Sequence, residues 1–325
     1  MSAYIIRRIF QSVIVVMAMA VIVFFGVNIV GDPVDMLVNP EMTQLEIEAT
    51  IRGLGLDKPI WEQFLYFIKG AFTGDLGKSF IFGTPALKLI LQRMPATMEL
   101  AFSALFLAIV FGIPLGVYAG LRPNSPVSKT IMTGSILGFS LPTFWVGLMM
   151  IMVFAVMLGW LPSTGRGETA TVLGITSSIF TVDGLRHLIL PATNLALLKI
   201  SLTIRLTRAG TQEAIHQDYI KYARAKGLSE RRVILVHLMK NILIPVVTVI
   251  GLEFGGLIAF SVVTETIFAW PGMGKLLIDS IQLLDRPVIV AYLIMIVLVF
   301  VVINLVVDIL YSVLDPRVRL GGREQ

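Results

Sequence analysis

Cysteine is absent from this sequence, and charged residues are scarce. Without cysteine, disulfide bonds, thiolate metal sites and cysteine nucleophiles are excluded. Only 14% of the 325 residues are charged, roughly half the share in an ordinary soluble domain, whereas 56% are hydrophobic. Long apolar runs separated by short polar ones therefore place the chain among membrane proteins.

Motifs that mark an enzyme are also missing. Gly77-Lys78-Ser79 matches the end of a phosphate-binding loop, but Phe72 stands where that loop needs its first glycine. His187, His216 and His237 have no metalloprotease spacing and no clustered carboxylates, so we predict no metal site. We predict no catalytic residues either. Energy for uphill transport must then come from a partner or an ion gradient.

Six apolar stretches are long enough to span a membrane as helices, so we predict an all-α integral membrane protein. Glycine and proline recur in these stretches, as in residues 112–116, where they permit close backbone approach. Ser140-Leu141-Pro142 is expected to kink the third stretch. The stretches are residues 9–30, 98–120, 131–158, 188–206, 241–262 and 288–312.

The first stretch could be mistaken for a secretory signal. Arg7 and Arg8 precede the apolar run, and Ala18-Met19-Ala20 lies within it. The run nevertheless continues to Val30, which makes it long enough to span. We expect this segment to be retained.

Lysine and arginine positions set the orientation. With both termini inside, the cytoplasmic segments hold 15 basic residues, whereas the short outer loops after the third and fifth spans hold four. The outer segment 31–97 holds six more but is too long to count for much in the positive-inside rule. Both termini are therefore predicted to be cytoplasmic. The net charge of +5 follows from these flanks, so we expect contact with lipid and no nucleic acid.

We expect four regions along the chain. Residues 1–30 form the N-terminal tail and first span, and residues 31–97 a long periplasmic segment. Within that segment, apolar residues at helical spacing over 60–72 predict a short helix on the membrane surface. Residues 98–312 form a five-span core that includes a cytoplasmic loop, 207–240, and residues 313–325 form a cytoplasmic tail.

Ionisable residues within spans are costly and usually functional. Glu253 lies near the middle of the fifth span, Lys199 within the fourth, and Asp308 near the end of the sixth. Glu253 could line a polar pathway or contact substrate. Alternatively, it could pair with Lys199 and hold two helices together.

The cytoplasmic loop predicts two helices joined at a glycine. Asp218 can cap a short helix that ends at Gly227 in a left-handed conformation. Ser229 can cap the next helix, which continues through His237 into the fifth span. We call residues 218–229 the elbow. It suits docking into a groove on another protein, but it could equally be a basic loop that touches anionic headgroups.

Residues 218–227 resemble the "EAA" loop of bacterial ABC importer permeases, in the wording of the dipeptide/oligopeptide/nickel branch. His237, Asn241 and Pro245 follow in that branch's register, whereas Lys221 and Tyr222 replace the Glu and first Ala of the general motif. Further signatures occur in the branch's order along nearly the whole chain. They are residues 54–59, 74–79, 93–97, 159–162, 270–274 and 315–317.

The resemblance implies the permease fold of type I ABC importers and a bacterial inner-membrane location. It implies a second homologous permease, in a heterodimer or a homodimer, and two cytoplasmic ATPase subunits that carry ATP and Mg, with no cofactor on this chain. A periplasmic binding protein would deliver peptides, opines, glutathione-like molecules or nickel complexes.

Within this scheme the elbow would couple the spans to the ATPase, and Pro142, Phe144 and Glu253 would line the translocation path. The rival interpretation is a secondary transporter or channel that uses Glu253 or Asp308 for ion coupling, which predicts inverted repeats with paired broken helices. The coupling residues implied by the resemblance are Tyr219, Tyr222, Ala223, Arg224, Ala225, Lys226 and Gly227.

Overall fold

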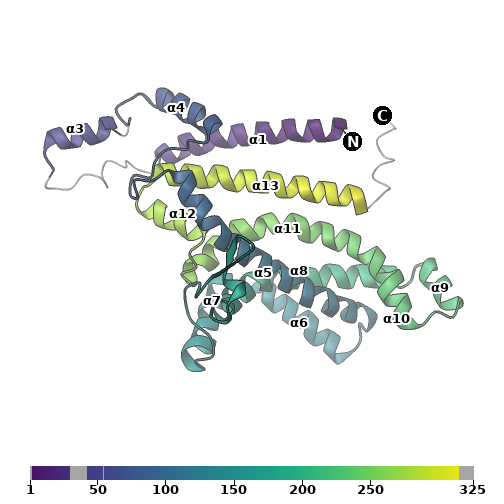
Figure 1. Ribbon diagram of the computed structural model, residues 1–325. Helices are drawn as coiled ribbons and strands as arrows, with labels where there is room; N and C mark the ends of the chain where they lie inside the picture. The colour runs from purple at the N-terminus through teal and green to yellow at the C-terminus, as the bar shows by residue number, and fades with distance from the viewer. Residues whose placement is uncertain (1, 30–41, 54, 315–325) are drawn as a thin grey trace. The chain divides into compact units, whose positions relative to one another are not determined.

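The computed structural model describes residues 2–29, 42–53 and 55–314 (Figure 1). Within them the chain is almost entirely helical and divides into two compact units. The first unit comprises residues 1–97 and 271–301, and the second comprises residues 98–270 and 302–325. The predicted tail from residue 315 onward, and residues 31–41 of the predicted outer segment, lie outside the described residues.

The first unit contains two long apolar helices and several short ones. Its core holds an aromatic cluster in which Phe24 of α1 stacks on Phe67 of α4, with ring centroids 5.3 Å apart. The Phe80 amide and the Ser79 hydroxyl both donate to Asp285, a fully buried carboxylate just before α13. Its helices are α1 (Ser2–Ile29), α3 (Gln44–Gly53), α4 (Ile60–Thr73), the beginning of α5 (Ala86–Leu121), α12 (Met273–Gln282) and most of α13 (Arg286–Leu314).

The second unit is built around α8 and α11. The remainder of α5 packs on α8, as do α6 and α7, and α7 also contacts α11. The elements after α5 are α6 (Pro126–Ser140), α7 (Thr143–Met150), a π-helix (Ile151–Met157), β1 (Ala170–Val172), β2 (Ile175–Ser177), a 3-10 turn (Ser178–Phe180), α8 (Val182–Ala214), α9 (Asp218–Ala225), α10 (Glu230–Arg232), a π-helix (Val233–Leu238) and α11 (Met239–Ile267).

Three glycines of α5, spaced four residues apart, give that helix its close approach to α8. A Cβ on Gly116 would lie 2.6 Å from the Cβ of Thr207 and 2.7 Å from the Ile204 carbonyl oxygen. Gly112 and Gly120 face Thr203 and Thr211 in the same way. Small residues at this spacing let membrane helices pack backbone to backbone, which confirms the close approach expected around residues 112–116.

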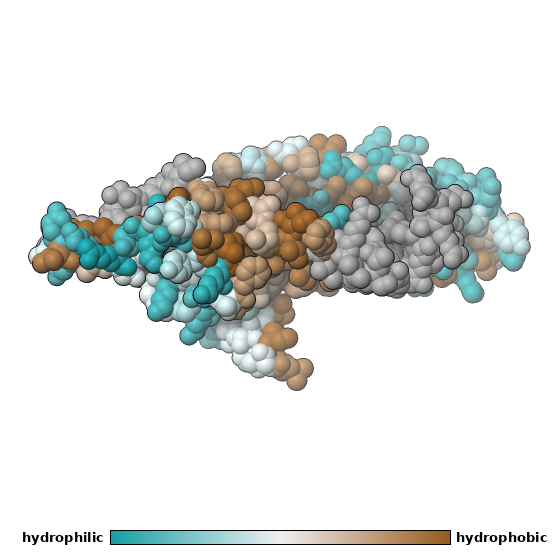
Figure 2. Space-filling view, turned by 90° about the horizontal axis from the view of Figure 1, so that it is seen from above, coloured by the Kyte–Doolittle hydropathy of each residue, from teal (hydrophilic) through white to brown (hydrophobic). Residues whose placement is uncertain are grey.

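Five described helices are long and apolar enough to cross a membrane, and a bent pair makes a sixth if it is one span. They correspond to the predicted spans, but most are longer. For example, α5 begins at Ala86 rather than near residue 98, and α8 extends from Val182 to Ala214. Hydropathy detects only the part of a helix that suits lipid, so the polar ends were missed. Figure 2 shows a broad area of hydrophobic side chains on the face in view.

The third predicted span, 131–158, is not one continuous helix. The chain leaves α6 at Ser140 and restarts as α7 at Thr143, and the two axes differ by 107°. The break falls at the predicted Ser140-Leu141-Pro142, but the bend is far sharper than a kink. A small antiparallel hairpin, β1 with β2, was also not predicted. Each strand has only three residues, which is too few to show the alternation of apolar and polar residues by which a sequence reveals a strand.

Candidate functional site

The elbow is a short helix followed by a tight glycine exit. Helix α9 ends at Ala225, and Gly227 adopts φ +74°, which side chains other than glycine tolerate poorly. The Leu228 amide reaches back to the Ala223 carbonyl oxygen at 3.4 Å and so closes the helix end. The chain then enters α10 and continues as one apolar helical segment, Glu230–Ile267. The left-handed stop predicted at Gly227 is therefore confirmed.

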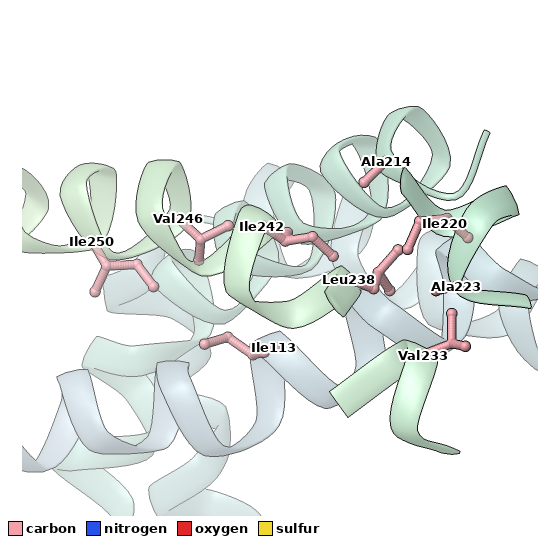
Figure 3. Packing of buried hydrophobic residues seen from close by; sticks show 9 residues of the cluster. All are labelled: Ile113, Ala214, Ile220, Ala223, Val233, Leu238, Ile242, Val246 and Ile250. Carbon is pink, nitrogen blue, oxygen red and sulfur yellow. The ribbon is translucent and has the colours of Figure 1, made fainter. Parts of the chain in front are cut away.

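The inner face of α9 is buried among the ends of the spans. Ile220 is 0% exposed and Ala223 is 4% exposed. They join an apolar cluster to which α8, the π-helix after α10, α11 and α5 all contribute (Figure 3). Burying one isoleucine side chain is worth about 1.5–3 kcal/mol, and α9 contacts the π-helix that leads into α11, so α9 is held firmly to that segment. The other buried members are Ile113, Ala214, Val233, Leu238, Ile242, Val246 and Ile250.

The outer face of α9 is aromatic and basic. Tyr222 is 62% exposed, and the Lys226 ammonium lies 4.6 Å from its ring centroid. Arg224 makes a two-pronged ion pair with Glu230 at 2.7 and 3.2 Å, which links α9 to α10 across the glycine exit. These partners leave an ordered, exposed surface for another molecule.

Tyr219 lies at the border of that surface. Burial raises the pKa of its hydroxyl above the ordinary 10.0, and a hydrogen bond with the Asn241 side chain opposes this only in part. The phenol therefore stays neutral at physiological pH and offers a neutral hydrogen-bonding group beside the basic side chains.

Six of the seven predicted coupling residues are exposed, and one is not. Ala223 packs in the internal cluster, because it lies on the same helix face as Ile220. Asp218 does not cap α9: the cap position is Gln217, and the Asp218 carboxylate instead pairs with Lys221 at 2.9 Å. Ser229 occupies the cap position of α10, but its side chain makes no capping bond. The exposed six are Tyr219, Tyr222, Arg224, Ala225, Lys226 and Gly227.

The predicted path residues fall in two places. Glu253 of α11 forms an ion pair with Lys199 of α8, and their side chains are 38% and 12% exposed. Pro142 and the exposed Phe144 lie at the start of α7, after the 107° break. Among the described contacts, none joins Glu253 to Pro142 or Phe144. Asp308 lies in α13, which continues to Leu314, and its interfacial placement stays a prediction.

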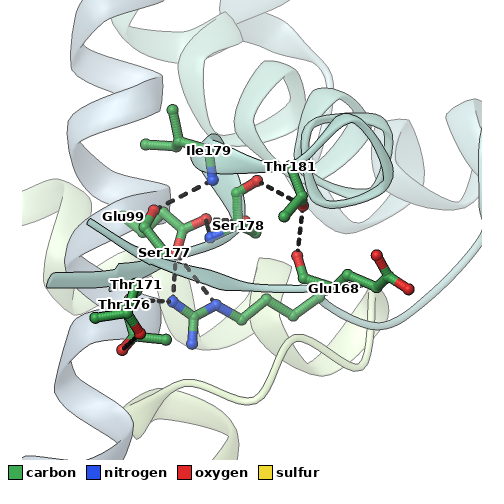
Figure 4. A network of polar contacts seen from close by, with 9 residues as sticks. Glu99, Glu168, Thr171, Thr176, Ser177, Ser178, Ile179 and Thr181 are labelled. Atoms are coloured by element: carbon green, nitrogen blue, oxygen red, sulfur yellow. Dashed lines mark hydrogen bonds and ion pairs between the residues drawn. The ribbon is translucent and has the colours of Figure 1, made fainter.

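A second polar cluster, missed in the sequence, anchors the hairpin segment. Glu99 of α5, 6% exposed, accepts from the Arg166 guanidinium and from the amide (3.2 Å) and hydroxyl of Ser178 (Figure 4). The Thr181 hydroxyl accepts from the Gly184 amide at 2.9 Å and so caps α8. Glu99 stands at the edge of an apolar run, where a carboxylate ordinarily faces water, so its burial had no signal in the sequence.

No cluster of three or more possible metal-ligating side chains occurs in the described part of the chain. Buried carboxylates are instead matched to protein donors. Glu265, fully buried in α11, accepts from the Ser261 hydroxyl at 2.9 Å. The described residues include one bent helix pair, whereas an inverted-repeat transporter calls for two in corresponding halves.

Two family models match the chain. Residues 1–101 match the N-terminal region of binding-protein-dependent transport system membrane components, and residues 112–320 match the binding-protein-dependent transport system inner membrane component. The oligopeptide transport system permease protein AppB of Bacillus subtilis is 40% identical, over 98% of this chain and 99% of its own length.

Two further relatives and one solved structure are similar. The di/tripeptide transport system permease protein DppB of Pseudomonas aeruginosa is 39% identical, over 91% of this chain and 95% of its own. The glutathione transport system permease protein GsiC of Escherichia coli is 37% identical over 98% and 99%. An inward-facing structure of the MetNI methionine ABC transporter has a TM-score of 0.53 at 16% identity, covering 70% of this chain and 96% of that one. That likeness concerns the fold alone.

Proposed function

The chain belongs to the family of binding-protein-dependent transport system inner membrane components and is the permease subunit of an ABC importer, and from this we propose that its elbow receives the ATPase and its spans carry small peptides. The ATPase of such an importer is a separate subunit, so this chain contributes the membrane path. It works with a solute-binding protein, ATPase subunits and a partner permease.

One observation carries the coupling proposal: α9 has a buried inner face and an exposed outer face. A groove on the ATPase subunit would bind the outer face around Tyr222, Arg224 and Lys226. Helix α9 contacts the π-helix Val233–Leu238, which leads into α11, and Ile220 is fully buried in the same apolar cluster, so a displacement of α9 would move α11 with it. Closure of the ATPase dimer would then favour one orientation of the spans, provided that it binds α9 differently in the two states.

The cargo we propose is a small peptide or a peptide-like molecule such as glutathione. Three relatives that align along nearly their whole length are transport permeases for di/tripeptides, oligopeptides and glutathione. We further propose that the partner permease is a related but different chain, and that segment 31–97 faces the periplasm and meets the binding protein.

The path we propose runs past the broken third span and α11. At the break, the Leu141 amide still donates to the Leu137 carbonyl oxygen at 3.1 Å, but Leu141 itself is extended (φ −81°, ψ 136°) and Pro142 has no amide hydrogen to donate. Phe144 is 54% exposed. Glu253 is partly exposed beside Lys199, so the pair could present both charges to a zwitterionic peptide. Irregular backbone and charge are tolerated at membrane depth where they line a cavity.

Crosslinking tests the coupling proposal directly, because the natural chain has no cysteine. Tyr222→Cys, paired with cysteines around the surface groove of the ATPase subunit, should form an intersubunit disulfide in the assembled importer. Ile220→Cys, two residues away on the buried face of α9, is the matched control and should not. If Tyr222→Cys forms no link to any ATPase position while the importer remains intact, the elbow is not the docking site.

Uptake tests the cargo. The importer and its binding protein, reconstituted in liposomes, should take up a labelled dipeptide in an ATP-dependent manner. An excess of unlabelled peptide should compete. Competition by a nickel complex but not by peptide would assign a different cargo.

A further inference from the structure

Two cavities of the first unit meet along the same two helices. The larger, ≈ 630 Å³, is lined by Val27 near the end of α1 and by Val290 in the first turns of α13. The smaller, ≈ 310 Å³, lies further along both helices, and Leu76 lines both cavities. The part of the smaller cavity's lining that the structure describes is apolar residues and glycine, among them Val16, Ala20, Ile68, Leu87, Ile294 and Leu298.

The larger cavity is basic and hydrogen-bonding. The Lys58 ammonium lies 4.2 Å from the ring centroid of Tyr66, and both residues line the cavity. Among the described lining residues there is one carboxylate, Asp75, which accepts from the Gly77 amide at 3.0 Å. The first turn of the 29-residue helix α13 also lines it, through Arg286 and Pro287, and the buried Asp285 carboxylate stands directly before this turn. The described lining cations are Arg52, which also pairs with Glu48 at 3.4 Å, Lys58, Lys78 and Arg286.

The distance between the two cavities matches the distance between the headgroup of a phospholipid and its acyl chain. On α1, Val27 of the basic cavity and Ala20 of the apolar cavity are seven residues apart, which is about 10 Å along a helix. On α13, Val290 and Leu298 give a similar separation in the opposite chain direction. Both helices therefore order the cavities in the same way, with the basic one at the outer end.

We propose that these cavities form a binding site for one anionic phospholipid of the outer leaflet. The phosphate lies among the four cations, and an acyl chain occupies the apolar groove between α1, α4 and α13. Its described lining shares no residue with the elbow or with the proposed path.

The observations favour lipid over other occupants. An acidic protein segment or a free phosphate would use the basic cavity and leave the groove empty, while a partner helix would use the groove alone. Helix α4 also carries exposed Trp61, Leu65 and Phe72, the last of which lines the groove. Exposed aromatic residues of this kind gather at the level of lipid headgroups.

Native mass spectrometry of the intact importer, stripped of lipid and titrated with phosphatidylglycerol or phosphatidylcholine, tests the site. Phosphatidylglycerol should bind more tightly than phosphatidylcholine. Lys58→Gln and Lys78→Gln should each weaken phosphatidylglycerol about fivefold, equivalent to about 1 kcal/mol per cation near a headgroup. Lys69→Gln, on the exposed part of α4 and outside both cavities, is the matched control and should have no effect.

A second pair of variants tests the chain groove. Ala20→Phe should fill the groove and reduce binding of both lipids, whereas Val21→Phe, on the exposed side of the same helix, should reduce neither. Equal affinity for the two lipids, or equal loss in Lys69→Gln, would overturn the proposal. It would also fail if glycerol phosphate, which has no chains, displaced phosphatidylglycerol at similar concentration, because the basic cavity would then be a free-phosphate site.

Discussion

At residue 227 the backbone requires glycine for its conformation and not for its size. Gly227 has φ +74°, yet a Cβ built there meets no atom within 4 Å. An ordinary residue would pay about 1–2 kcal/mol for this left-handed geometry, and a β-branched residue more. Replacing Gly227 by a β-branched residue should therefore change the direction in which the chain leaves α9, without creating a clash between side chains.

Gly227→Val should lower the amount of peptide transported per ATP hydrolysed, because the elbow can no longer hold its angle against α10. Gly227→Asn, which tolerates left-handed backbone, should retain most of the coupling. Transport and ATPase activity of the reconstituted importer measure the ratio. Normal coupling in Gly227→Val would show that the turn has no part in transmission.

The Lys199–Glu253 pair either holds two helices together or lines the translocation path. Measurements of stability and of transport on variants distinguish these two roles. Removing one partner leaves an unmatched charge within a span, which is strongly unfavourable when it is buried. Because Glu253 is 38% exposed, we expect Glu253→Gln to cost only about 1–3 kcal/mol.

The double variant Lys199→Met/Glu253→Met should recover stability, since neither charge remains. If the pair contacts cargo, as we propose, this variant should melt like the natural protein and still transport poorly. Thermal unfolding in detergent and uptake in liposomes provide the two readings. Full recovery of uptake would assign the pair a structural role alone.

At the scale of elements, the contact of α5 with α8 leaves no room for a side chain at its glycines. A Cβ on Gly116 would lie only 2.7 Å from the Ile204 carbonyl oxygen, which is backbone and cannot move aside. We expect Gly116→Ala to push the helices apart and to cost about 1–3 kcal/mol. Gly134→Ala, in α6 with nothing within 4 Å, is the matched control and should be neutral or slightly stabilising. Melting temperatures in one detergent test the pair, and equal shifts would contradict this packing.

The sequence revealed these elements to the extent that hydropathy and turn residues encode them. Apolar length located the spans, and helical spacing located α4 at Ile60–Thr73 against a prediction of 60–72. Ser140-Leu141-Pro142 marked the break but not its 107° angle, because the angle depends on how α6 and α7 each pack on α8. The hairpin depends on Arg166 reaching Glu99, a contact 67 residues apart that local patterns do not contain.

The elbow was predictable in outline for the same reason. A glycine after a short amphipathic run indicates a helix end, and Gly227 has that role. Which face of α9 is buried could not be read from eight residues, so Ala223 was placed with the exposed coupling residues although it lies inside. The buried Glu99, Glu265 and Asp285 were missed because their partners are supplied by the fold.

For the whole molecule, the orientation follows from the distribution of charge and has a simple test. The coupling proposal requires the elbow to be cytoplasmic, and the positive-inside rule places the hairpin between β1 and β2 on the opposite side. Leu173 at the hairpin turn is 98% exposed, and Tyr222 in the elbow is 62% exposed, so cysteines at either position can react.

Single-cysteine variants in the naturally cysteine-free chain should therefore label from opposite sides. In intact spheroplasts, a membrane-impermeant maleimide should modify Leu173→Cys and leave Tyr222→Cys unmodified. After permeabilisation both should react, whereas Ile220→Cys, which is fully buried, should stay unmodified and so report that the fold is intact. Labelling of Tyr222→Cys from outside would show that the predicted orientation is wrong and would contradict the coupling proposal, because no cytoplasmic ATPase could then reach the elbow.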